Sequence, residues 1–238
     1  NRNMSEVGNE ILPAERQREL PHRYMLGLYE MLEEITKRFP DVLFEGCSGG
    51  GGRFDPGMLY YFPQIWTSDD SDAIERLYIQ EGTYMAYPAC SMGAHVSAVP
   101  NHQVGRVTSI DARAAVAMTG QFGYELDLNK LSDEEFDKVK GEVALYKELS
   151  PVIREADYSR IKSVYKDHYS AWEFNYKEGE KAVLMICETL GRANPAPDYI
   201  KLTGLDPDAM YKERFTERRV RGEYLMNVGL IHYSRRDF

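Results

Sequence analysis

The sequence predicts an α/β protein, in which a parallel sheet is followed by a small antiparallel β domain. From residue 14 to about 150, strand and helix patterns alternate along the chain in four strand-then-helix units. Such a succession favours a parallel sheet that is either doubly wound or half of a (β/α)8 TIM barrel. After residue 155, short β-type runs divided by Gly, Pro and Asp replace this alternation. We therefore expect two domains, 1–155 and 156–238.

A helix precedes the first strand. Apolar residues recur at helical spacing over 24–39, and Pro40 ends the pattern. A short buried strand is expected at 42–47, and a second strand at 58–68 after a glycine-rich turn. Residues 72–87 then show the spacing of a helix with one apolar face. A loop therefore follows the carboxyl end of each of these strands.

The third and fourth units follow the same order. We expect a strand and loop at 90–100, a helix of small residues at 111–120 and a strand at 122–128. The last helix of the series opens with a capping box formed by Ser132 and Glu135. The apolar residues expected to face inward on this helix are Phe136, Val139, Val143 and Tyr146.

The second domain is predicted from its turns. Residues 171–187 read as a hairpin, because an acidic, glycine-bearing turn separates two runs rich in β-forming residues. Further short strands are expected within 198–215 and 223–234. Small antiparallel domains of this size are common beside barrels.

Composition excludes several classes of function. The 38 acidic residues outnumber the 29 basic ones, so the net charge of −9 argues against nucleic-acid partners and anionic membranes. No apolar run approaches the roughly 20 residues of a membrane span. The three cysteines are too few for a disulfide framework, and no metal-ligand spacing occurs. We expect no metal and no cofactor.

Three aspartates follow the second predicted strand, in the stretch QIWTSDDSDAIER at 64–76. Acids at a helix start complement the helix dipole and accept hydrogen bonds from free backbone N–H groups. Alternatively, one of Asp69, Asp70 and Asp72 is a catalytic carboxylate at the mouth of a barrel. The local sequence favours the structural role and leaves the catalytic one open.

A glycine-rich stretch follows the first predicted strand, at 45–57. It lacks the lysine of a phosphate-binding loop, and no clear helix is expected directly after it. Consecutive glycines also allow a ligand to approach the backbone closely. Cys47 stands at the end of that strand, where it could contact the ligand or simply be buried.

Polar groups thus gather after three predicted strands, near Cys47, at 68–69 and at 91–95. In a parallel barrel these strand ends share one rim, which is where active sites lie. Paired carboxylates on such a rim are typical of glycoside hydrolysis. Periodicity and spacing do not identify the substrate.

Several long stretches resemble the α-galactosidases of glycoside hydrolase family 36, and the resemblance runs from residue 1 to the end. These stretches are NRNMSE, LPAERQRELPHRYMLGLYEML, FPDVLFEGCSGGGGRFDPGMLYYFPQIWTSDDSDAIER, SMGAHVSAVPNHQVGR and FGYELDL. The resemblance implies a retaining enzyme that removes terminal α-linked galactose from oligosaccharides such as melibiose and raffinose. It also implies that 1–155 is the C-terminal half of a catalytic (β/α)8 barrel and that 156–238 is a C-terminal antiparallel β-sandwich domain.

The resemblance assigns roles to particular residues. The family's nucleophile is the aspartate of a Lys-Trp-Asp-Met-Asn-Arg motif, whose last two residues match Asn1 and Arg2. The nucleophile is therefore expected just before residue 1, in a longer parent chain. The family's acid/base falls on Asp69, which leaves its two neighbouring aspartates for helix capping. Contacts with the sugar carry over to Asn1, Cys47 and Gly50.

One departure from the family pattern concerns the glycine-rich turn. The family commonly has Cys-Ala-Ser-Gly-Gly-Gly where this chain has Cys47-Ser48 and four glycines, so the serine before Gly50 is lost.

Other functions stay open at this stage. Relatives in the family transfer galactosyl groups or act on N-acetylgalactosamine, and a non-catalytic fragment is a further alternative. The expected parent is cytoplasmic and homo-oligomeric, and the chain by itself is expected to be inactive.

Overall fold

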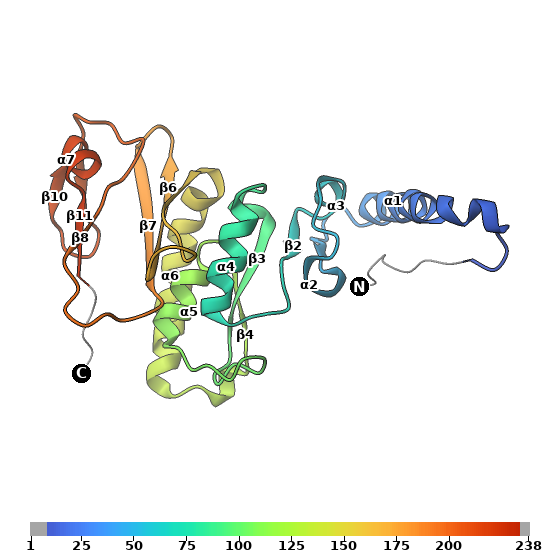
Figure 1. Ribbon diagram of the computed structural model, residues 1–238, viewed down its shortest axis with the longest axis horizontal. Helices are drawn as coiled ribbons and strands as arrows, with labels where there is room; N and C mark the ends of the chain where they lie inside the picture. The colour runs from blue at the N-terminus through green and yellow to red at the C-terminus, as the bar shows by residue number, and fades with distance from the viewer. Residues whose placement is uncertain (1–8, 234–238) are drawn as a thin grey trace. The chain divides into compact units, whose positions relative to one another are not determined.

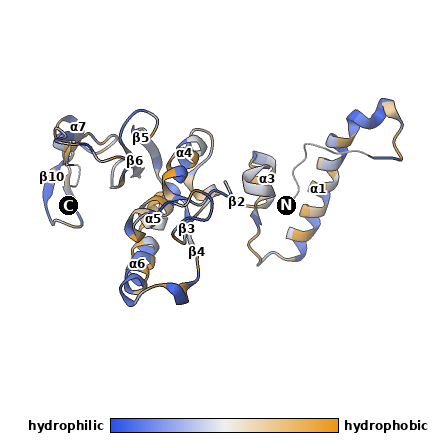
Figure 2. Cartoon of the chain, turned by 60° about the horizontal axis from the view of Figure 1, so that its bottom comes forward, coloured by the Kyte–Doolittle hydropathy of each residue, from blue (hydrophilic) through white to orange (hydrophobic). Residues whose placement is uncertain are grey.

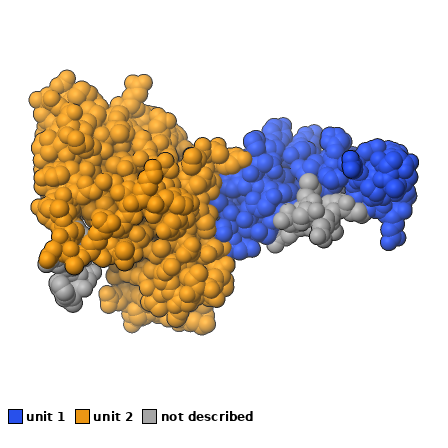
Figure 3. All heavy atoms as spheres, viewed as in Figure 1, with its two compact units in different colours: residues 1–69 blue, residues 70–238 orange. Residues whose placement is uncertain are grey.

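The computed structural model describes residues 9–233. The chain divides into two compact units, residues 1–69 and 70–238 (Figure 3). The division separates parts of the chain that are compact in themselves, and it does not test the domain boundary expected between 155 and 156. That boundary stays a prediction.

The first unit contains a long helix (Figure 1) and a pair of parallel strands. Its elements are η1 (Ala14–Glu19), α1 (Leu20–Arg38), β1 (Glu45–Gly46), α2 (Ser48–Gly51), α3 (Pro56–Tyr61) and β2 (Gln64–Trp66). Helix α1 ends at Arg38, and its C-cap Phe39 stands directly before Pro40. The helix carries hydrophobic and hydrophilic residues in alternating patches (Figure 2). Strands β1 and β2 pair in parallel, and Leu32, Met58 and Ile65 form the buried core.

The prediction of a strand over 58–68 is wrong for its first half. Asp55 caps helix α3, since its carboxylate accepts a hydrogen bond from the backbone N–H of Met58 at 2.9 Å, and Pro56 occupies the first turn. The aromatic run that suggested a strand therefore lies on a short helix. The same helix begins within the stretch 45–57, where no helix was expected. The strand expected at 42–47 shortens to β1.

The parallel part of the second unit alternates strands and helices. Its elements are α4 (Ala73–Tyr84), η2 (Ala89–Ser91), β3 (Met92–Ser97), α5 (Ile110–Ala117), β4 (Gln121–Glu125), η3 (Leu128–Lys130) and α6 (Asp133–Glu155). Strands β3 and β4 pair in parallel, in a register that places Gly93 opposite Gln121. Their inner face packs on α5 and α6 through buried residues that include Ala94, Val96 and Val139.

The predicted capping box of α6 is confirmed. Ser132 accepts a hydrogen bond from the backbone N–H of Glu135, and the Glu135 carboxylate accepts one from the backbone N–H of Ser132. The predicted inward face is wrong at Phe136, which is 40% exposed, whereas Val139 is 7% exposed. The ammonium group of Lys140 lies 4.8 Å from the Phe136 ring centroid, so the ring is covered by a cation.

The last part of the chain is antiparallel, as the sequence predicted. Strands β5 (Asp157–Lys162), β6 (Tyr169–Tyr176) and β7 (Lys181–Glu188) form one sheet, and the turn at 177–180 closes the predicted hairpin. Helix α6 packs against β6 and β7 (Figure 1). The remaining elements are β8 (Asp198–Ile200), β9 (Met210–Lys212), β10 (Arg219–Arg221), α7 (Gly222–Asn227) and β11 (Leu230–His232). Short strands were expected within 223–234, where β11 is one; helix α7 corrects this expectation for the first half of that stretch.

Within the described residues no helix is long and apolar enough to cross a membrane. The same residues hold no group of three or more His, Cys, Asp or Glu side chains that could bind a metal ion.

Candidate active site

The glycine-rich turn after β1 is left-handed. Ser48, Gly49, Gly50 and Gly51 have φ angles of 56°, 66°, 75° and 85°. The N–H of Gly51 donates to the carbonyl of Cys47 at 2.7 Å, which closes a single left-handed turn. Residues other than glycine rarely adopt this backbone conformation. Glycine at three of the four positions therefore keeps the free-energy cost of the turn low.

This turn lies directly against the backbone that follows β2. A methyl group built on Gly50 would stand 2.7 Å from the backbone nitrogen of Asp69, and one on Gly51 would stand 2.5 Å from the carbonyl oxygen of Thr67. Both distances are shorter than any van der Waals contact. Glycine is therefore required at both positions for the turn to approach Asp69.

Three of the four predicted site residues come together here. Asp69 is exposed, and the thiol of Cys47 lies 4.0 Å from its Oδ1 atom. Gly50 meets the Asp69 backbone as described above. Asn1, the fourth, lies outside the described residues. The roles given to these residues stay predictions.

The neighbouring aspartates have structural roles. Asp72 caps helix α4, since its Oδ2 atom accepts hydrogen bonds from the backbone N–H groups of Ile74 at 3.0 Å and Glu75 at 3.1 Å. Asp70 accepts one from the N–H of Asp72 at 3.1 Å. The prediction of helix capping is confirmed for Asp72, whereas the hydrogen bond that Asp70 accepts comes from Asp72, the residue before the helix.

Sequence reasoning missed the partner of the buried Asp72 carboxylate. The Asp72 side chain is 1% exposed and pairs with the guanidinium of Arg106, which also lies 3.3 Å from Glu75. Arg106 stands within a stretch that suggested the family, yet no role was assigned to it. The signal that could have indicated a cationic partner is a helix cap that is buried. A buried carboxylate such as that of Asp72 needs a nearby positive charge, because an uncompensated buried charge is costly.

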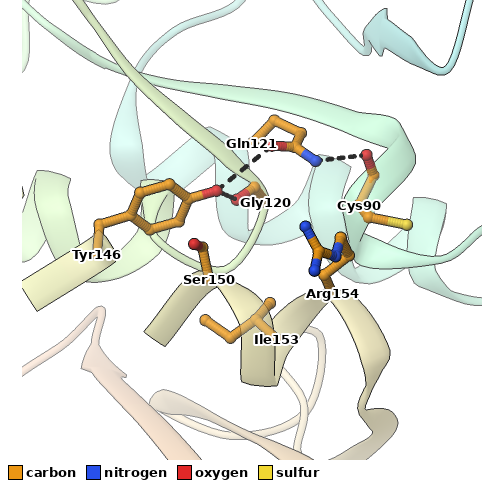
Figure 4. A pocket seen from close by; sticks show the side chains of 7 residues that line it. All are labelled: Cys90, Gly120, Gln121, Tyr146, Ser150, Ile153 and Arg154. Carbon is orange, nitrogen blue, oxygen red and sulfur yellow. Dashed lines mark hydrogen bonds between the residues drawn. The ribbon is translucent and has the colours of Figure 1, made fainter. Parts of the chain in front are cut away.

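A separate cavity of about 110 Å³ lies at the amino ends of β3 and β4 (Figure 4). Its residues are Cys90, Gly120, Gln121, Tyr146, Ser150, Ile153 and Arg154. The Gln121 amide donates to the Cys90 carbonyl at 2.8 Å and the Tyr146 hydroxyl to the Gly120 carbonyl at 3.0 Å, and burial raises the pKa of Tyr146. No carboxylate lines the cavity, and catalytic groups of parallel α/β folds gather at the opposite strand ends.

The arrangement around Asp69 suits proton transfer. A carboxylate that follows a parallel strand, next to a thiol and exposed backbone, can exchange a proton with a bound polar molecule. Double displacement at a sugar needs a second carboxylate about 5–5.5 Å away. None of the described residues was assigned the role of this second carboxylate.

Comparison with known protein families gives two adjacent matches. The model described as Melibiase matches residues 1–156, and the one described as the Glycosyl hydrolase family 36 C-terminal domain matches residues 169–238.

Comparison with individual proteins gives high similarity over most of the chain. Alpha-galactosidase AgaA of Geobacillus stearothermophilus is 52% identical over 212 residues, which are 89% of this chain and 29% of the relative. Alpha-galactosidase Mel36A of Lactobacillus acidophilus is 47% identical over 229 residues, which are 96% of this chain and 31% of the relative. The chain thus spans about a third of the length of these relatives.

Comparison with solved structures gives the same similarity over most of the chain. A variant of the Geobacillus AgaA, crystallised in complex with raffinose, superposes with a TM-score of 0.94 at 48% identity. An alpha-galactosidase from Lactobacillus brevis gives a TM-score of 0.93 at 41% identity. Each comparison covers 98% of this chain and 32% of the other.

Proposed function

This chain belongs to glycoside hydrolase family 36, and we propose that the full-length protein carrying it is a retaining α-galactosidase. Its proposed substrates are oligosaccharides that end in α-linked galactose, such as melibiose and raffinose. Relatives solved in complex with raffinose and stachyose support this substrate class. The single observation that carries the proposal is the placement of Asp69 against Gly50 and Cys47.

In the proposed mechanism Asp69 is the acid/base. A nucleophilic aspartate, proposed to precede Asn1 in the full-length protein, attacks the anomeric carbon while Asp69 protonates the leaving oxygen. Asp69 then takes a proton from a water molecule, and this water releases galactose from the enzyme. Since both carboxylates are needed, the 238-residue chain alone is expected to show no turnover.

The other predicted residues have binding roles in this proposal. Cys47 and the partly exposed backbone of Gly50 contact the sugar beside Asp69, and Asn1 contacts a sugar hydroxyl. Residues 1–155 supply the C-terminal half of the barrel, and residues 156–238 form the accessory β domain.

The test of the proposal is Asp69→Ala in the full-length protein. Natural galactosides have poor leaving groups, so their turnover should fall by roughly 10²- to 10⁴-fold. An activated aryl α-galactoside needs little protonation, so galactosyl-enzyme should form rapidly and accumulate as a burst. Azide needs no deprotonation and should restore turnover, yielding the α-linked azide because two inversions retain configuration.

The matched control is Asp70→Ala. It removes the acceptor for the Asp72 N–H and should lower stability by about 0.5–2 kcal/mol, with neither a burst nor azide rescue. The assignment of Asp69 fails if Asp69→Ala slows aryl and natural substrates equally and azide has no effect. The proposed function fails if the wild-type protein hydrolyses an α-glucoside but no α-galactoside.

A further inference from the structure

We infer that Arg106 is a positioning residue for Asp69, an inference that rests on the proposed function. Arg106 acts through Asp72 and does not need to touch the substrate. Asp70–Asp72, hereafter the bridging segment, follows Asp69 directly in the chain and joins it to helix α4. Fixing this segment limits the movement of the backbone that carries the acid/base.

The carboxylate of Asp72 is the central anchor of the bridging segment. Its Oδ2 atom accepts from two backbone N–H groups of α4 and from Nη1 of Arg106. The side chain of Asp72 is 1% exposed, while that of Arg106 is 36% exposed. Because the carboxylate is buried, loss of Arg106 leaves its charge undercompensated and strains the start of α4.

Ser71 gives the bridging segment three further contacts, one with the last residue of β3 and two with the loop that follows this strand. Its N–H donates to the side-chain oxygen of Gln103 at 3.1 Å, and its carbonyl accepts from the hydroxyl of Ser97 at 3.0 Å. Its hydroxyl accepts from the amide of Asn101 at 3.3 Å. The segment is therefore bound at both Ser71 and Asp72 to one neighbouring loop.

That loop, residues 101–106, has its own internal order. The Asn101 side-chain oxygen accepts from the N–H groups of Gln103 at 2.9 Å and Val104 at 3.2 Å. The N–H of Asn101 donates to the carbonyl of Arg106 at 2.9 Å. Arg106 thus projects from a closed loop, which makes it a fixed support for Asp72.

Helix α4 offers a matched pair for comparison. Further along the same helix, the carboxylate of Glu81 is 0% exposed and pairs with Arg160 at 3.1 Å. This second arginine also binds a buried carboxylate from a half-exposed position, but it stands far along the chain from Asp69. Loss of either arginine should destabilise α4, whereas only loss of Arg106 should disturb the acid/base.

The experiment compares Arg106→Met, Arg106→Lys and Arg160→Met in the full-length protein. Each variant is assayed on melibiose and on an activated aryl α-galactoside, and its apparent Tm is measured. In Arg106→Met, kcat/KM for melibiose should fall about 10-fold further than for the aryl substrate, because misplacement by about 1 Å can cost 10²-fold and only melibiose depends strongly on the acid. Arg106→Lys retains one contact and should give a smaller shift in the same direction.

Arg160→Met should lower the apparent Tm by a similar amount and leave the ratio of the two substrates within about 2-fold of the wild type. The inference is overturned if Arg106→Met slows both substrates equally, or if Arg160→Met changes the ratio as much. If Arg106→Met does not fold, the ratio measured for Arg106→Lys decides. An inactive wild type would instead remove the proposed function, so the two failures are distinct.

Discussion

Two turns of this chain contain consecutive residues with left-handed backbone angles. They differ in composition and in the backbone that they approach. The turn after β1 has φ angles of 56° to 85° over Ser48–Gly51, and three of its four residues are glycine. The turn between β6 and β7 has φ angles of 47°, 52° and 93° at Lys177, Glu178 and Gly179. Only one of its left-handed residues is glycine.

The difference follows from what each turn approaches. Lys177 and Glu178 are exposed, so the hairpin turn tolerates side chains there. A methyl group on Gly179 would lie 2.8 Å from the carbonyl oxygen of Gly204, so glycine is needed at that point. In the first turn two successive glycines meet the backbone before Asp70. A run of glycines therefore indicates a segment whose backbone lies very close to another backbone segment. In this chain the two segments meet at the candidate site.

The largest effect is expected for Gly50→Ala. The new methyl group would overlap the backbone nitrogen of Asp69 at 2.7 Å, at a φ of +75°, so the turn or Asp69 must move. We expect turnover of melibiose by the full-length protein to fall by about 10²-fold. Gly49→Ala is the control, because the same turn has open space at Gly49 and only the left-handed strain of about 1–2 kcal/mol applies. Equal losses of turnover in the two variants would contradict a role for close approach.

Gly179→Ala tests the other turn. Strain at a φ of +93° and overlap with Gly204 and Leu205 should lower stability by about 1–3 kcal/mol. Kinetic constants per folded molecule should stay unchanged, because the backbone that Gly179 meets, at 204–206, lies far along the chain from Asp69. Thermal unfolding and active-site titration of the full-length protein measure both quantities. A specific loss of kcat without a loss of stability would break the comparison.

Sequence patterns predicted the regular parts of the fold well. The capping box of α6 and the hairpin of β6 and β7 were both identified, because their signals are local. Helices α3 and α7 were missed, since both are six residues long and rich in residues that also form strands. Short segments of this kind take their structure from caps and tertiary contacts rather than from periodicity.

The candidate site was less accessible to such patterns. Cys47, Gly50 and Asp69 were identified through the family resemblance, and local sequence alone favoured a capping role for the aspartates. The buried polar side chains of α4, Arg76, Gln80 and Glu81, were not foreseen, because each also has a partner outside the helix that lies farther away in the sequence. Arg106 was missed for the same reason, since its partner stands 34 residues earlier.

The smallest effect, and a pH dependence, is expected at Glu173, which adjoins the contact made by the second turn. Glu173 on β6 is 0% exposed, and its Oε2 atom accepts hydrogen bonds from Thr203, the residue before Gly204. Its other oxygen has no hydrogen-bond partner among the described residues. Burial raises the pKa of Glu173 above its ordinary value of 4.5.

The sign of the effect follows from this raised pKa. In the pH window between the unfolded and folded pKa values the folded state binds more protons, so stability falls as pH rises through that window. Above the folded pKa this loss of stability is complete, whereas below about pH 4.5 both states are protonated and no stability is lost.

Glu173→Gln stays neutral and can still accept from Thr203, so it should be more stable than the wild type by about 1 kcal/mol at pH 8. That gain should shrink towards zero at pH 4, which apparent Tm values of the full-length protein across this range will measure. The proposed galactosidase activity per folded molecule should not change, because Glu173 contacts Thr203 and lies far along the chain from Asp69. A gain that is constant with pH would show that Glu173 is not the titrating group.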